Sequence, residues 1–167
     1  MVALHLARRT VSGPLLRLPG EVKAVVANGS AIPPQMIAAY EAAEYRIEAD
    51  PPIVLRMGQM SEPLAGLMVD KNMKSAAFLT ACNPHGQMLG AADNATRTAA
   101  LGAELERFAP LVLPACGVDP AGRWPDEPGF LALGCPPAII EALGRRHRQN
   151  ALVLCGEDAV PRLVLLR

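Results

Sequence analysis

Apolar residues in the first half of the chain follow spacings typical of short helices and strands. Over residues 35–44 they recur at intervals of three and four, which predicts one face of a helix. Two short strands are predicted at 45–49 and 53–57, because each apolar run is bounded by turn-forming residues. A second helix is predicted over 61–70, where a serine suits the cap and a proline suits the first turn.

A buried strand and the longest helix follow. Residues 75–81 are small or apolar almost without interruption, as in a strand covered on both faces, and the turn signal 83–86 ends the run. A helix is predicted over 92–109, with Asn94 and Phe108 on the same face as its core leucines.

The last third of the chain repeats this alternation. The predicted elements are a strand at 111–116, a turn-rich loop at 117–128, a strand at 130–134, a helix at 136–148, and strands at 151–155 and 162–166. Alternating strands and helices predict an α/β (or α+β) layered domain, with a mixed β-sheet of about five to seven strands and three to four helices packed on it.

Composition supports one folded domain preceded by an arm. With 51% hydrophobic and 19% charged residues, the chain has the material for a packed core. The domain is expected to span 34–167. Residues 1–33 are expected to form a flexible arm, with one strand at 22–27, because glycine and proline interrupt any long helix there.

The charge balance and the cysteines narrow the function classes. Sixteen basic and sixteen acidic residues, with few aromatics, make nucleic acid an unlikely partner. No apolar run is long enough to span a membrane, and no secretory signal is recognised, so a cytoplasmic protein with reduced thiols is expected. The four cysteines occur singly, at Cys82, Cys116, Cys135 and Cys155, and their spacing predicts no metal site. Each cysteine falls at the end of a predicted strand, and the four sulfur atoms could converge if those strands ran parallel.

Several separated polar motifs together resemble the bacterial family called domain of unknown function 3293. The resembling segments lie in order between residues 38 and 166: Ala39-Tyr40, Tyr45-Arg46, Leu55-Arg56-Met57-Gly58, Thr80-Ala81-Cys82-Asn83-Pro84, Asn94, Gly122-Arg123-Trp124-Pro125 with Glu127, Leu143-Gly144-Arg145-Arg146, and Gln149-Asn150-Ala151. The resemblance implies a single domain and assigns no activity or cofactor. The family pattern places aromatic residues at or beside Cys82 and His147, which argues against a nucleophile and a general base at these positions.

The first candidate group is Thr80, Asn83 and Asn94. A strand that ends in a polar turn, followed by a helix, places side chains at the sheet edge where ligands often bind. Alternatively, Asn83 organises the turn and Asn94 satisfies backbone groups near the start of the helix. Both interpretations remain open.

The second candidate group lies near the end of the predicted 136–148 helix. Arg145, Gln149 and Asn150 are rich in hydrogen-bond donors that suit a phosphate or a carboxylate. Cations in the last helical turn also interact favourably with the helix dipole, so the arginines could serve only as a cap. Helical spacing places Arg146 partly toward the core and Arg145 on the same face as Glu141.

Trp124 and Glu127 form a third group in the predicted loop. Trp124 could line a binding site or simply cover the core, and Glu127 is the best candidate for an acid or a base. No motif identifies an enzyme or a cofactor. We therefore expect a domain that binds or modifies a small anionic or nucleotide-like ligand, with a non-catalytic protein–protein interaction module as the alternative. The oligomeric state is not predictable from these patterns.

Overall fold

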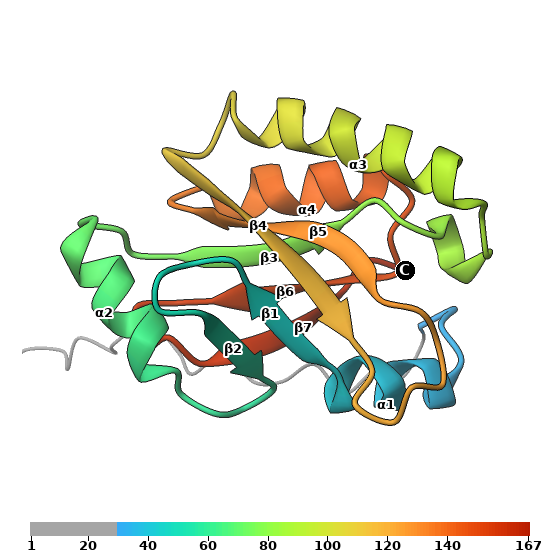
Figure 1. The fold of residues 1–167 in the computed structure, drawn as a ribbon, viewed down its shortest axis with the longest axis horizontal. Helices are drawn as coiled ribbons and strands as arrows, with labels where there is room; N and C mark the ends of the chain where they lie inside the picture. The colour runs from blue at the N-terminus through green and yellow to red at the C-terminus, as the bar shows by residue number, and fades with distance from the viewer. Residues whose placement is uncertain (1–29) are drawn as a thin grey trace, which may run out of the picture.

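A computed structural model describes residues 30–167, which contain seven strands, four α-helices and one 3-10 turn (Figure 1). In chain order the elements are α1 (Pro34–Ala42), β1 (Glu44–Ile47), β2 (Ile53–Arg56), α2 (Glu62–Asp70), β3 (Ala76–Thr80), η1 (Pro84–Gly86), α3 (Ala91–Leu105), β4 (Leu111–Val118), β5 (Glu127–Leu133), α4 (Pro137–Arg146), β6 (Ala151–Cys155) and β7 (Pro161–Leu165). The predicted numbers of strands and helices are confirmed. The predicted strand at 22–27 and most of the predicted arm lie outside the described residues.

The seven strands form one sheet in the order β2-β1-β4-β5-β3-β6-β7. Every neighbouring pair in this order is antiparallel, whereas the sequence analysis expected strands of mixed direction. The ends of β3 and β4 and the starts of β5 and β6 therefore lie at the same end of the strands. Cys82 and Cys116 lie near this end and Cys135 and Cys155 lie near the opposite end, so the four thiols do not converge.

The sheet curls until its two outer strands approach each other. The backbone N–H groups of Gly58 and Ser61, which follow β2, donate hydrogen bonds to the carbonyls of Pro161 and Ala159 at the start of β7, at 2.9 and 3.1 Å. Helices α1 and α2 lie at opposite ends of the curled sheet, and α3 and α4 lie together on its outer side (Figure 1). The concave side therefore has two ends, each with its own helix.

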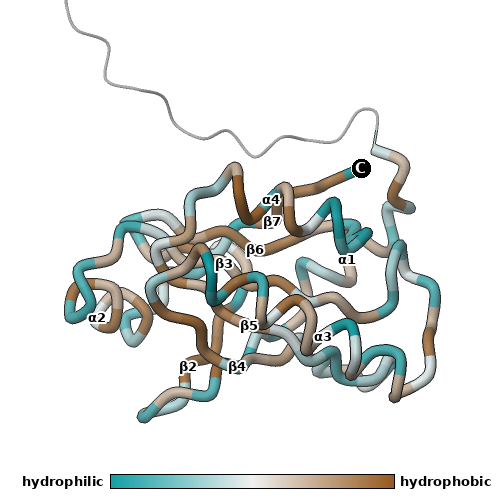
Figure 2. Tube along the Cα trace, turned by 90° about the horizontal axis from the view of Figure 1, so that it is seen from above, coloured by the Kyte–Doolittle hydropathy of each residue, from teal (hydrophilic) through white to brown (hydrophobic). Residues whose placement is uncertain are grey.

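Alternate strand residues divide between two cores, one on each side of the sheet. On the concave side, Phe78 and Leu131 pack with Leu64 and Met68 of α2. On the convex side, residues of β3 and β6 pack with the apolar faces of α3 and α4. Hydrophobic residues concentrate in the strands along the chain trace (Figure 2). Strand β3 is buried on both faces, as its nearly continuous apolar sequence predicts.

Several segment boundaries differ from the predictions, most clearly those of α3 and β5. Helix α3 ends at Leu105, four residues before the predicted end, and Phe108 is 43% exposed instead of facing the core. The N–H of Phe108 bonds to the carbonyl of Leu105, so the chain tightens into a turn before Pro110. Glu127 is the first residue of β5 and not a loop residue, because backbone pairing with Gly117 extends both β4 and β5 beyond their apolar stretches.

Candidate functional site

A pocket of about 200 Å³ opens at the α1 end of the curled sheet. We call it the mouth pocket. Helix α1 forms one wall and the concave face of the sheet forms the other. Its apolar and aromatic lining includes Met36, Tyr40, Tyr45, Phe78, Met88 and Trp124, and its polar lining is Thr80, Asn83, Glu127, Gln149 and Asn150. Apolar walls with a few convergent polar groups are typical of small-molecule sites.

Most of the predicted site residues meet in this pocket. Five of the seven predicted ligand-binding residues line it, namely Thr80, Asn83, Trp124, Gln149 and Asn150, together with the predicted acid or base Glu127. Gln149 connects the first two groups directly, because its Nε2 donates to the carbonyl of Cys82 at 2.9 Å. The structure thus brings the turn after β3 and the segment after α4 to the same place.

Asn83 is the centre of the turn at the end of β3. Its backbone adopts the left-handed conformation with φ 48°, which asparagine tolerates better than most residues. Its side-chain oxygen accepts from the N–H of Leu89 and from Nδ2 of Asn94, both at 3.0 Å. Asn94 in return accepts from the backbone N–H of Asn83 at 3.0 Å. Asn94 therefore organises the turn that carries Asn83 and does not itself line the pocket.

Thr80 fastens the end of β3 to its neighbour. Its hydroxyl donates to the carbonyl of Pro128 at 2.7 Å and accepts from the N–H of Cys82 at 3.0 Å. The Cys82 sulfur is buried and lies 3.6 Å from the hydroxyl of Thr98. Both side chains serve to shape the pocket, because their polar atoms are engaged within the protein.

Gln149 and Arg97 hold the segment after α4 against the turn after β3. Gln149 is 7% exposed, and its Nε2 also approaches the carbonyl of His147 at 3.3 Å. Arg97 of α3 donates to the carbonyls of Ala81 and His147, at 2.7 and 2.6 Å. The sequence analysis did not single out Arg97, since a lone arginine inside a helix has no distinguishing pattern.

Tyr40 and Asn150 join α1 to the sheet. Nδ2 of Asn150 donates to the Tyr40 hydroxyl at 3.0 Å, and its Oδ1 accepts from Arg167 at 3.1 Å. The Tyr45 hydroxyl donates to the carbonyl of Tyr40 at 2.9 Å. Burial raises the pKa of Tyr40 and raises the pKa of Tyr45 further. Both phenols therefore stay protonated at neutral pH. The sequence analysis placed Tyr40 in the first predicted helix and in a segment that carries the family resemblance, but not among the candidate site residues.

Among the described residues that line the mouth pocket, Glu127 is the one charged residue. Its Oε1 accepts from Nδ2 of Asn83 at 2.7 Å. Burial raises the pKa of its carboxyl group, and the hydrogen bond from Asn83 partly opposes this shift. A half-buried carboxyl group with one oxygen anchored can bind a donor or exchange a proton with a ligand.

Trp124 lies in the loop between β4 and β5, half-buried beside the pocket. The guanidinium of Arg123 stacks over its ring at 5.0 Å, and the same arginine forms an ion pair with Asp119 at 3.0 Å. Hydrogen bonds from Arg123 hold the pKa of the Asp119 carboxyl at about 2. This arrangement orders the loop and supports Trp124 from outside the pocket.

Arg145 does not lie at the mouth pocket. It is exposed on α4 and pairs with Glu141 at 3.0 Å, the partner that helical spacing predicts. Arg146 was expected to face the core partly, but its side chain is 72% exposed. His147 is buried instead, 3.6 Å from the Glu104 carboxylate of α3, and burial lowers its pKa. The buried face of α4 is formed by Ile140, Leu143 and Gly144, and Arg146 lies off this face.

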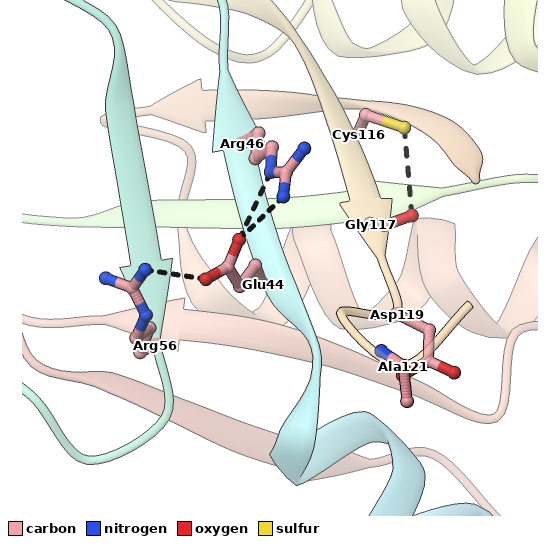
Figure 3. Close-up of polar contacts among 7 residues, drawn as sticks. All are labelled: Glu44, Arg46, Arg56, Cys116, Gly117, Asp119 and Ala121. Carbon is pink, nitrogen blue, oxygen red and sulfur yellow. Dashed lines mark hydrogen bonds and ion pairs between the residues drawn. The ribbon is translucent and has the colours of Figure 1, made fainter. Parts of the chain in front are cut away.

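Away from the pocket, Glu44 of β1 joins Arg46 and Arg56 at 2.9 and 2.6 Å (Figure 3). Both guanidinium groups are about half exposed, so the cluster consists of two surface ion pairs, of which the pair with Arg56 joins β1 to β2. On the neighbouring strand β4, burial raises the pKa of the Cys116 thiol to about 11, which keeps it protonated. Among residues 30–167, no group of His, Cys, Asp and Glu side chains is arranged to hold a metal ion.

One comparison with known proteins agrees with the resemblance of the sequence to the family of domain of unknown function 3293. No curated protein and no solved structure matches the chain. Within residues 30–167, no helix is both long and apolar enough to cross a membrane. The model of one family, described as protein of unknown function DUF3293, matches residues 79–152. This segment, which includes Thr80, Asn83, Asn94, Glu127 and Gln149, is similar to the DUF3293 family.

Proposed function

We propose that this protein binds a small molecule in the mouth pocket. The observation that carries the proposal is the convergence of Asn83, Glu127 and Gln149 on one pocket with apolar and aromatic walls. These residues come from three separate segments of the chain, and each is positioned by hydrogen bonds to backbone or neighbouring side chains. Such preorganisation lowers the cost of binding, because little side-chain freedom remains to be lost.

The ligand class expected from the arginine-rich helix end is revised in this proposal. Among residues 30–167, neither an arginine nor a lysine lines the mouth pocket, and Arg145 lies elsewhere. A volume of about 200 Å³ is below the usual range for drug-sized ligands, so a complete nucleotide is a poor match. A compact molecule with an apolar or aromatic body suits the walls better.

The alternative of a non-catalytic interaction module stays a prediction. It rests on the missing catalytic motifs and on the leucines of residues 2–18, which lie outside the described part of the chain. The large exposed apolar side chains among the described residues are Met60, Val69, Met88 and Phe108, and they come from different segments. They give no specific support for a partner surface.

The proposal is tested by closing the pocket from α1. Ala39 lines the pocket, so Ala39→Phe should fill it, whereas Ala38→Phe places the same ring on the exposed side of the helix. A library of aromatic fragments is screened by thermal shift, because a ligand that binds the native state raises the melting temperature. We expect fragments that stabilise the wild type and Ala38→Phe but leave Ala39→Phe unchanged. Equal responses in all three proteins would contradict the proposal.

A further inference from the structure

Each side-chain amide nitrogen around the mouth pocket already donates at least one hydrogen bond within the protein. Asn83 Nδ2 donates to Glu127, Asn150 Nδ2 donates to the Tyr40 hydroxyl, and Gln149 Nε2 donates to two backbone carbonyls. Within residues 30–167, the lining includes no arginine, lysine or histidine. An anionic ligand therefore finds no cationic side chain among the described residues of the pocket.

The orientation of each amide group follows from its neighbours. Asn83 Oδ1 accepts from a backbone N–H, and Asn150 Oδ1 accepts from a guanidinium, so neither amide can be reversed without facing donor against donor. Gln149 must direct its NH2 group at the carbonyls of Cys82 and His147. This assignment leaves the oxygen of Gln149 as the atom free for other contacts.

Two acceptor atoms of the lining remain unused by the described residues. Glu127 Oε2 accepts no hydrogen bond from residues 30–167, since Asn83 occupies only Oε1. Gln149 Oε1 likewise has no donor in that range, although the Gln149 residue is 93% buried. A polar atom in such a site gains most from a partner that completes its hydrogen bonds.

Because Glu127 Oε2 and Gln149 Oε1 have no donor among the described residues, we infer that the mouth pocket selects ligands with a hydrogen-bond donor head group. This head group is of the amine, amidine or amino-heterocycle class and is directed at Glu127 and Gln149. The inference deepens the proposed function and rests on it. A positively charged head group gains most, because its hydrogen bond to the Glu127 carboxylate is charge-assisted. The aromatic walls suit a planar body, and cations are attracted to the faces of aromatic rings.

The same residues disfavour anionic ligands. A carboxylate placed at this end of the pocket would face the carboxyl of Glu127 and the oxygen of Gln149. The donors left among the described lining side chains are neutral: the Tyr40 hydroxyl, the Trp124 indole N–H and one N–H of the Asn83 amide, none of which has an acceptor within residues 30–167. Without a cationic side chain, neutral donors do not offset the cost of burying an anion beside the Glu127 carboxyl group.

Three probes of nearly equal shape test the inference: benzamidine, benzamide and benzoate. Their binding to the full chain is measured at pH 7.5 by ligand-observed NMR titration, with Ala39→Phe as the closed-pocket control. We expect benzamidine to bind at least about tenfold more tightly than benzoate, with benzamide between them. In Glu127→Gln, which keeps an oxygen for Asn83, this preference should fall about tenfold or more.

The outcomes separate the inference from the proposed function. Benzoate binding as tightly as benzamidine, at a pocket that Ala39→Phe closes, would overturn the donor class and leave small-molecule binding intact. A benzamidine preference that persists in folded Glu127→Gln would also overturn it. Binding of the probes that Ala39→Phe does not reduce would count against the mouth pocket itself, and therefore against the proposed function as well.

Discussion

The environment of Glu127 differs from that of an ordinary surface carboxylate. Glu127 lies half-buried among aromatic side chains, with Asn83 as its hydrogen-bond donor. Burial opposes ionisation, so the folded state holds the Glu127 proton to a higher pH than the unfolded chain does. The energetic consequence appears as a dependence of stability on pH.

We expect Glu127→Gln to become increasingly stable relative to the wild type as pH rises from 4 to 8. The stability that the raised pKa of Glu127 contributes is complete below the ordinary glutamate pKa of about 4.3 and is lost as pH rises through the folded-state value. Glutamine undergoes no such loss. Urea unfolding at several pH values measures the difference, with Glu106→Gln at an exposed position as the control. A difference that is constant or shrinks with pH would be contrary to a raised pKa.

At the scale of elements, the helices show where a glycine is needed and where it is not. Gly66 lies in the exposed middle of α2, and a Cβ added there would meet no atom within 4 Å. Gly102 of α3 packs against the sheet, and a Cβ there would lie 2.8 Å from Cζ of Phe130. The close approach of α3 to β5 therefore depends on the absence of a side chain at Gly102.

Gly66→Ala should raise the free energy of unfolding by about 0.5–1 kcal/mol, because alanine favours the helix and restricts the unfolded chain. Gly102→Ala makes the same chemical change in a helix but should lower the free energy of unfolding, since the Phe130 ring must move. Urea denaturation of both variants beside the wild type measures the two signs. Stabilisation by both substitutions would contradict the tight packing of α3 on β5.

At the scale of the whole molecule, one sheet separates two apolar cores. Leu131 belongs to the concave core beneath α2, and Leu79 belongs to the convex core beneath α3 and α4; both are fully buried. Their strands β3 and β5 are paired along their length, with Leu79 opposite Phe130. Neither core can loosen without disturbing strands that the other core needs.

Leu131→Ala and Leu79→Ala should therefore each cost about 2–5 kcal/mol and shift a single unfolding transition. Circular dichroism reports the helices during urea unfolding, and fluorescence reports Trp124 near the mouth pocket. The two signals should coincide in the wild type and in both variants. Separate transitions, one for each core, would show that the sheet does not couple the two sides.

The local pattern of the chain was sufficient to predict nearly all described elements. Apolar spacing and turn residues report which segments are helices or strands, because these signals come from neighbouring residues. The same signals located the polar turn at Asn83 and the donor-rich segment at Gln149. They could not show that β4 and β5 extend to Gly117 and Glu127, since this extension comes from backbone pairing between the two strands.

The amino-acid sequence by itself determined the fold class, the approximate boundaries of the elements and a set of candidate residues that includes most polar residues of the mouth pocket. Only the tertiary structure decided that the strands are all antiparallel, that Gln149 meets the turn after β3, and that Arg145 remains outside. The physical reason is the distance along the chain over which each signal acts. The apolar periodicity of a segment depends on neighbouring residues, whereas the contacts of a residue depend on how a curled sheet brings distant segments together. Only that arrangement shows that Glu127 Oε2 and Gln149 Oε1 have no donor among residues 30–167, once each amide has taken its internal partner.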